Sequence, residues 1–265
     1  MGCPVITFLS DYGLEDGFVG VCHAVIAGIC PDARIIDLVH WVPRGDVRAG
    51  ALILYDALPY LPVGVHLAVV DPGVGSARRG IAVRAGDGRL LVGPDNGLLS
   101  LAAERAGGAV EAVDIGASPF ALARVSATFH GRDVFAPVAA RLAGGAALAD
   151  AGEPCDPAGL VMLEMSVARV EGGFLVAHVS HVDRFGNVQL DVEDPSFEVG
   201  AVLEVVMGSG RSQRARYART FAEAGAGELI LYEDSSGRLA VAVNGGDAAA
   251  RLDLADDDEL RIRLA

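Results

Sequence analysis

The sequence predicts an α/β protein: an N-terminal α/β sandwich with a mainly parallel sheet, followed by a smaller, barrel-like all-β domain. Three observations support this prediction. Short apolar runs alternate with segments of helical periodicity through residues 1–145. A Gly-, Ala- and Pro-rich stretch over 146–162 indicates a linker. From 163 to 265 the chain offers only short strand-like segments separated by turns.

Each element of the first domain has its own signal. Apolar residues at helical spacing predict a helix over 17–30, which Pro31 stops. The unbroken apolar run at 65–73 is typical of a buried parallel strand. The remaining elements are expected as strands at 4–13, 33–42 and 111–116, a hairpin at 80–99, and helices at 46–62, 98–107 and 132–145.

Charge and composition exclude several classes of function. The formal net charge of −14 argues against a nucleic-acid or anionic-membrane surface. All 21 basic residues are arginine, so there is no lysine for a Schiff base, a pyridoxal phosphate anchor or a Walker motif. Because neither a signal peptide nor a membrane-spanning apolar run is evident, we expect a soluble cytoplasmic protein.

The cysteines and histidines give no metal pattern. No C-x-x-C pair occurs, and we expect small buried thiols in a reducing cytosol; the cysteines are Cys3, Cys22, Cys30 and Cys155. His178 and His181 would point to opposite faces of a strand, which opposes shared ligation. No metal site is predicted.

Acidic side chains follow two of the predicted parallel strands. Asp11 and Asp71 each come at the end of an apolar run. Ligands of such sheets bind beyond the carboxyl ends of the strands, so both loops are candidate sites. Asp11 suits the two hydroxyls of a ribose, and the alternative is a helix N-cap.

Asp71, Arg78 and His130 form a candidate catalytic set. A carboxylate pairs with arginine, and an imidazole accepts or relays a proton near neutral pH, so the three together can hold and polarise a water. The alternative is a turn cap, a solvated arginine and a helix cap. Arg79 is adjacent to Arg78, and the sequence alone does not decide between them.

The β domain has polar loops of its own. Asp183 and Asn187 flank Phe185 between two strands. An Asn amide can read an adenine edge or a carboxylate, and a Phe can stack on a base, whereas the alternative is plain hairpin-turn chemistry. Ser235 lies in a turn and Asn244 at a strand end, which alone indicates no function.

Six motifs occur in one order along the chain: TFLSDYGLEDGFVG, DPGVGSARR, GPDNGLL, TFHGRDVFAPVAA, HVDRFGNVQLD and SSGRLAVAVNGGDAA. Together they resemble the S-adenosylmethionine hydroxide adenosyltransferase family, hydrolase relatives of the fluorinase and chlorinase, almost from end to end. The resemblance implies that water or hydroxide, oriented by Asp71, Arg78 and His130, attacks C5′ of S-adenosylmethionine to give adenosine and methionine.

The resemblance also implies how the substrate is held. Ribose binding falls on Asp11, and the adenine and methionine contacts fall on the β domain, at Asp183, Phe185, Asn187, Ser235 and Asn244. It implies a homotrimer with sites between subunits and no cofactor besides the substrate. Two other functions stay open: a halogenase, in which halide replaces water, and a non-catalytic sensor of adenosine or S-adenosylmethionine. The complete Asp–Arg–His set favours water, because a halide needs a dehydrated anion pocket and no base.

Overall fold

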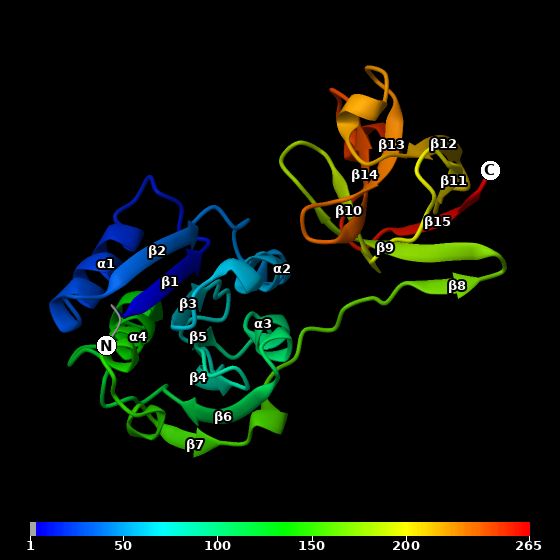
Figure 1. The fold of residues 1–265 in the computed structure, drawn as a ribbon. Helices are drawn as coiled ribbons and strands as arrows, with labels where there is room; N and C mark the ends of the chain where they lie inside the picture. Colours follow the sequence, from blue (N-terminus) through cyan, green and yellow to red (C-terminus); the bar gives the residue numbers. More distant parts are fainter. Residues whose placement is uncertain (1–3) are drawn as a thin grey trace. The chain divides into compact units, whose positions relative to one another are not determined.

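The computed structural model describes residues 4–265, so Cys3 lies outside the described part (Figure 1). The chain divides between Leu163 and Glu164 into two compact units. The first is an α/β sandwich and the second a β-barrel, as the sequence predicts.

The first unit is built on a seven-stranded sheet in the order β2-β1-β3-β5-β4-β6-β7. Its strands are β1 (Val5–Ser10), β2 (Arg34–Val39), β3 (Val65–Val69), β4 (Gly80–Ala85), β5 (Leu90–Pro94), β6 (Ala109–Asp114) and β7 (Glu153–Cys155). Strands β2, β1, β3 and β5 are parallel, whereas β4 is antiparallel to both β5 and β6. The sheet is therefore mixed rather than mainly parallel, because the short turn between β4 and β5 allows only an antiparallel pair.

Helices cover both faces of this sheet (Figure 1). Helices α1 (Phe18–Ile29) and α4 (Ala136–Ala143) pack on one face, and α2 (Val47–Ala57) and α3 (Ser100–Arg105) on the other. Because side chains alternate along a strand, β1 gives Phe8 to the first core and Leu9 to the second. A π-helical turn, Gly131–Phe135, leads directly into α4.

The stretch 146–162, expected to be a linker, packs onto the first unit. Strand β7 pairs with β6, and short 3-10 turns flank it at Leu148–Asp150 and Pro157–Gly159. Further along, Arg79 donates to the Gly159 carbonyl oxygen at 2.7 Å, and Asp95 accepts from the Val161 amide at 2.9 Å. These contacts explain why the boundary between the units falls after residue 163.

The second unit is an eight-stranded sheet closed on itself. Its strands are β8 (Arg169–Glu171), β9 (Phe174–Val182), β10 (Val188–Glu193), β11 (Val202–Met207), β12 (Ser212–Tyr217), β13 (Leu229–Glu233), β14 (Arg238–Val243) and β15 (Glu259–Leu264). Pairing of β10 with both β14 and β9 closes the barrel, and β8 extends β9. Closure removes the exposed strand edges of an open sheet. A short helix, α5 (Ala248–Leu252), contributes to the barrel core.

Cys22 and Cys30 are buried and unpaired, as expected, whereas Cys155 is half-buried. Within residues 4–265, no helix is both long and apolar enough to cross a membrane.

A pair of glycine substitutions tests the packing of the sheet. A Cβ at Gly93 in β5 would overlap the Ala68 carbonyl oxygen of β3, whereas a Cβ at the exposed Gly28 of α1 meets no atom within 4 Å. We expect Gly93→Ala to lower the free energy of unfolding by about 1–3 kcal/mol, and Gly28→Ala to raise it by roughly 0.5 kcal/mol. Urea denaturation measures both, and equal effects of the two substitutions would contradict the close approach of β5 to β3.

Candidate active site

Arg78 joins Asp71 to His130. The Arg78 Nε donates to Asp71 Oδ1 at 2.8 Å, and Nη2 donates to Asp71 Oδ2. The same Nη2 donates to His130 Nδ1 at 3.1 Å. The Asp71 and Arg78 side chains are only 6% and 12% exposed, so water screens the ion pair weakly. The three residues predicted as a catalytic set thus form one connected group.

The loop after β3 is shaped by its glycines and by Ser76. The Ser76 hydroxyl donates to the Gly73 carbonyl oxygen at 2.7 Å, and its oxygen accepts from the Arg78 amide at 3.2 Å. Gly75 adopts a φ of +76°, and a Cβ there would lie 2.5 Å from the Ala127 carbonyl oxygen. Only glycine allows this approach, which brings the loop against the segment that leads to His130.

The electrostatic surroundings of His130 favour its neutral form. Burial lowers the pKa of His130 below its ordinary 6.5, and the neighbouring Arg78 cation lowers it further, while Asp71 opposes them. Since Arg78 can only donate, the Nδ1 facing it must present a lone pair. A neutral His130 therefore carries its proton on Nε2.

Asp11 leaves the same edge of the sheet as Asp71. In the parallel pair of β1 and β3, Ser10 lies opposite Val69, so the loops after both strands begin side by side. One Asp11 carboxylate oxygen accepts from the Gly45 amide at 2.9 Å. The N-cap of α1 is Gly17 rather than Asp11, so the N-cap alternative is wrong.

Tyr12 is a polar neighbour that the sequence did not single out. A Cβ at Gly131, the residue after His130, would overlap the Tyr12 hydroxyl. Burial, with Cys22, Asp11 and Asp71 nearby, raises the pKa of Tyr12 well above 10. The hydroxyl therefore stays protonated beside the ion pair. Its position inside the SDYG motif was the available signal.

The adjacent Arg79 serves a different purpose. Its Nε donates to Asp95 at 2.9 Å, and Asp95 has a side chain only 2% exposed. Together with the Gly159 contact, this pair fastens the segment after β7. The structure thus places Arg78, and not Arg79, beside Asp71 and His130.

The barrel carries a cavity of about 880 Å³. Four of the predicted binding residues line it: Asp183, Phe185, Asn187 and Ser235. Sequence reasoning missed other polar and aromatic side chains in the lining, namely His181, Gln189, Phe221, Tyr232, Asp234 and Ser236. Gln189, in β10, follows Asn187 by two positions, and side chains two apart in extended backbone share a face, which was the available signal.

Asp183 organises the loop that carries Phe185. Its Oδ1 accepts from the backbone amides of Phe185 and Asn187 at 2.8 and 2.9 Å, and its Oδ2 accepts from the Asn187 side chain at 2.8 Å. Phe185 is 63% exposed on this braced loop. By contrast, Asn244 is not among the lining residues, and its side chain donates to the Ala224 carbonyl oxygen at 2.8 Å.

Family models match both units of the chain. The model described as "SAM hydroxide adenosyltransferase N-terminal domain" matches residues 6–152, and the corresponding C-terminal domain model matches 177–261. This chain belongs to the SAM hydroxide adenosyltransferase family. The family assignment agrees with the motifs that surround Asp71, Arg78 and His130.

Several proteins are similar to this chain over nearly its whole length. A protein of Salinispora tropica named "(R)-S-adenosyl-L-methionine hydrolase" is 54% identical, covering 98% of this chain and 97% of its own. A protein of the same name from Thermus thermophilus is 41% identical, covering 97% and 98%. The fluorinase of Actinoplanes sp. is 28% identical, covering 94% and 93%.

A solved structure has the same fold. The crystal structure of an uncharacterized conserved protein from Thermotoga maritima superposes with a TM-score of 0.91 at 37% identity, covering 97% of this chain and 99% of that one.

The contact between Arg78 and His130 predicts a measurable titration. We expect NMR titration of the imidazole to give His130 a pKa below 6.5. Arg78→Gln should raise this pKa, because the nearest cation is lost while the Asp71 carboxylate remains. Arg84→Gln, which removes a half-exposed partner of Glu111, is the control and should leave it unchanged. A His130 pKa that Arg78→Gln leaves unchanged would contradict the contact between Arg78 and His130.

Proposed function

We propose that this chain hydrolyses S-adenosyl-L-methionine, with water or hydroxide attacking C5′ to release adenosine and L-methionine. The observation that carries the proposal is the connected group of Asp71, Arg78 and His130. The membership of this chain in the SAM hydroxide adenosyltransferase family supports the reaction. The names of the relatives that are 54% and 41% identical support the (R) epimer at sulfur as substrate.

The leaving group in this reaction needs no protonation by the protein. A sulfonium sulfur takes the electron pair of the broken C5′–S bond and departs as the neutral thioether of methionine. The new bond joins the water oxygen to C5′, and one proton is released in each turnover. The protein therefore has to orient one water and favour its hydroxide form.

The contacts of Arg78 indicate how the group would do this. Both Asp71 oxygens accept from Arg78, and the Nδ1 lone pair of His130 faces the same guanidinium. Neither group is a free base in this arrangement. The cation of Arg78 favours hydroxide over water electrostatically, and the Nε2–H of neutral His130 donates to it. Proton release to solvent then completes the step.

The barrel cavity would hold the remainder of the substrate. Phe185 offers an exposed ring to the adenine, and the Asp183–Asn187 pair lies beside it for polar contacts. Asp11 would accept the ribose hydroxyls. We propose that Asn244 supports the lining of this cavity through its side-chain hydrogen bond to the Ala224 carbonyl oxygen, without contacting the substrate. No cofactor or metal enters the proposal, so treatment with EDTA should leave the rate unchanged.

We also propose a homotrimer whose sites use residues of neighbouring subunits. The triad of Asp71, Arg78 and His130 lies in the first unit, whereas the cavity lies in the second. Each unit therefore supplies only part of the required chemistry. Sedimentation equilibrium tests the assembly and should give three times the mass of one chain. The buried free thiols Cys22 and Cys30 support a cytoplasmic location.

The assay that tests the function is a chromatographic time course with the separated (R) and (S) epimers. We expect adenosine and methionine in equal amounts from the (R) epimer, with no dependence on chloride. Binding without turnover would indicate a sensor, and a chloride-dependent halogenated adenosine would indicate a halogenase. Either result would overturn the proposal.

Two matched substitutions connect this activity to the triad. Arg78→Lys loses the forked contact with Asp71 and should lower kcat about 100-fold or more. Arg79→Lys keeps the charge beside Asp95 and should change kcat less than threefold, since Arg79 contacts Asp95 and Gly159 rather than Asp71 or His130. Melting temperatures of both variants separate lost activity from lost folding. Equal losses of kcat would contradict the assignment of Arg78.

A further inference from the structure

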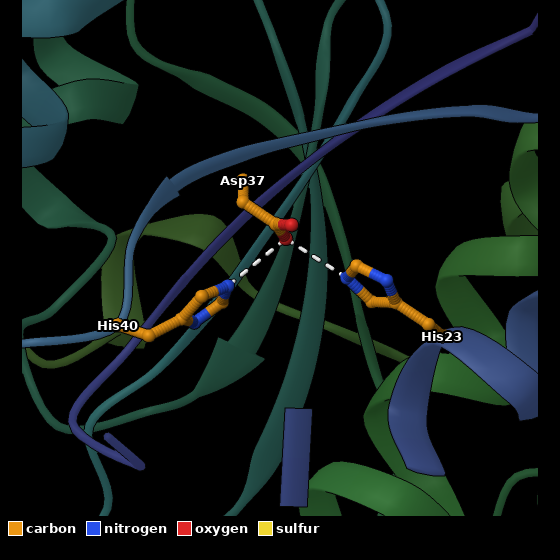
Figure 2. Close-up of side chains that lie close together, drawn as sticks. All are labelled: His23, Asp37 and His40. Carbon is orange, nitrogen blue, oxygen red and sulfur yellow. Dashed lines mark hydrogen bonds and ion pairs between the residues drawn. The ribbon is translucent and has the colours of Figure 1, made fainter. Parts of the chain in front are cut away.

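A second group of titratable side chains lies in the first unit, apart from the triad. Figure 2 shows His23, from α1, and His40, which follows β2, on either side of Asp37 in β2. Their Nε2 atoms lie 2.8 and 2.9 Å from the same Asp37 oxygen, Oδ1.

These separations fit hydrogen bonds rather than metal ligation. Tetrahedral ligands roughly 2.1 Å from a zinc ion are about 3.4 Å from one another, whereas N–H···O bonds place their heavy atoms at about 2.9 Å. A carboxylate can only accept, so both rings donate from Nε2 to Asp37.

The two histidines differ in what they contact next. The His40 side chain is 3% exposed, against 33% for His23, and its ring packs edge-on to Phe8 at a centroid distance of 4.7 Å. Its Nδ1 lies 2.7 Å from the Ser10 hydroxyl oxygen. Because the proton of a neutral His40 is on Nε2, this hydroxyl donates to Nδ1. Asp37, His40 and Ser10 thus form a continuous chain of hydrogen bonds.

The order Asp–His–Ser is that of an activated nucleophile, but Ser10 is fully buried and no substrate can reach it. Its oxygen instead accepts from the Tyr12 amide at 3.3 Å, which braces the backbone on both sides of Asp11. The His40 carbonyl oxygen accepts from the Gly13 amide at 2.7 Å, closing the same loop.

We propose that His40, held by Asp37, is a positioning residue that orients Asp11 toward the ribose hydroxyls of the substrate. The inference rests on the proposed function, in which Asp11 accepts those hydroxyls. One Asp11 oxygen is fixed by the Gly45 amide, and the other has no hydrogen-bond partner within residues 4–265. The hydrogen bonds that run from Asp37 through His40 and Ser10 to the backbone beside Asp11 set the direction in which that second oxygen points.

The test compares how full-length protein binds adenosine and 2′,3′-dideoxyadenosine, by calorimetry. Wild type should prefer adenosine by roughly 10- to 100-fold, and Asp11→Ala should abolish the preference. Two variants dissect His40. His40→Asn keeps an acceptor near Nδ1 for Ser10, whereas His40→Gln keeps only a donor near Nε2 for Asp37. We expect His40→Gln to reduce the preference about tenfold. His40→Asn should reduce it less, because Asn keeps the contact with Ser10 and loses only the support of Asp37.

His23→Asn is the matched control. It removes a donor to the same Asp37 oxygen, but His23, unlike His40, does not contact Ser10 beside Asp11. It should change the preference by less than roughly threefold. A preference that survives His40→Gln, or an equal loss of affinity for both nucleosides, would overturn the positioning role alone. Stoichiometric Zn²⁺ binding to wild type that His23→Asn abolishes would reassign the cluster as a metal site. If wild type binds neither nucleoside, the proposed function fails first and this inference with it.

Discussion

The ion pair between Arg78 and Asp71 is the interaction on which the proposed site depends. The Arg78 guanidinium also contacts His130, 52 positions further along the chain, and so joins the loop after β3 to the turn before α4. Since the Arg78 and Asp71 side chains are largely buried, removing one partner would leave an uncompensated charge, at a cost of about 3–5 kcal/mol. The same guanidinium fixes the tautomer of His130, so the Arg78 side chain sets both the geometry of the three residues and the position of the proton on His130.

The backbone around this pair is built to bring the two segments together. Gly75 permits a close approach to Ala127, and Gly131 leaves room for the Tyr12 hydroxyl. Neighbouring parallel strands deliver Asp11 and Asp71 to one edge of the sheet. The dense glycines after β3 are therefore explained by tertiary packing, since a simple turn would need fewer of them.

The sequence was sufficient for features that depend on local pattern. Apolar runs and helix stops located the elements of the first unit, and the rule on strand ends located Asp11 and Asp71. Features that depend on distant contacts were not predictable. The composition of residues 146–162 predicts a linker, because it does not reveal the contacts with Arg79 and Asp95. The chain from Asp37 to Ser10 likewise forms only when β1 and β2 pair.

The claim at the centre of this account is that a water oxygen attacks C5′ of S-adenosylmethionine. Mass spectrometry of a single turnover in H₂¹⁸O tests it most directly. The account predicts one ¹⁸O atom in the adenosine, at its 5′-hydroxyl, and none in the methionine. Adenosine without the label, or label in the amino-acid product, would show that the bond is broken by another route and would contradict the role given to Arg78, Asp71 and His130.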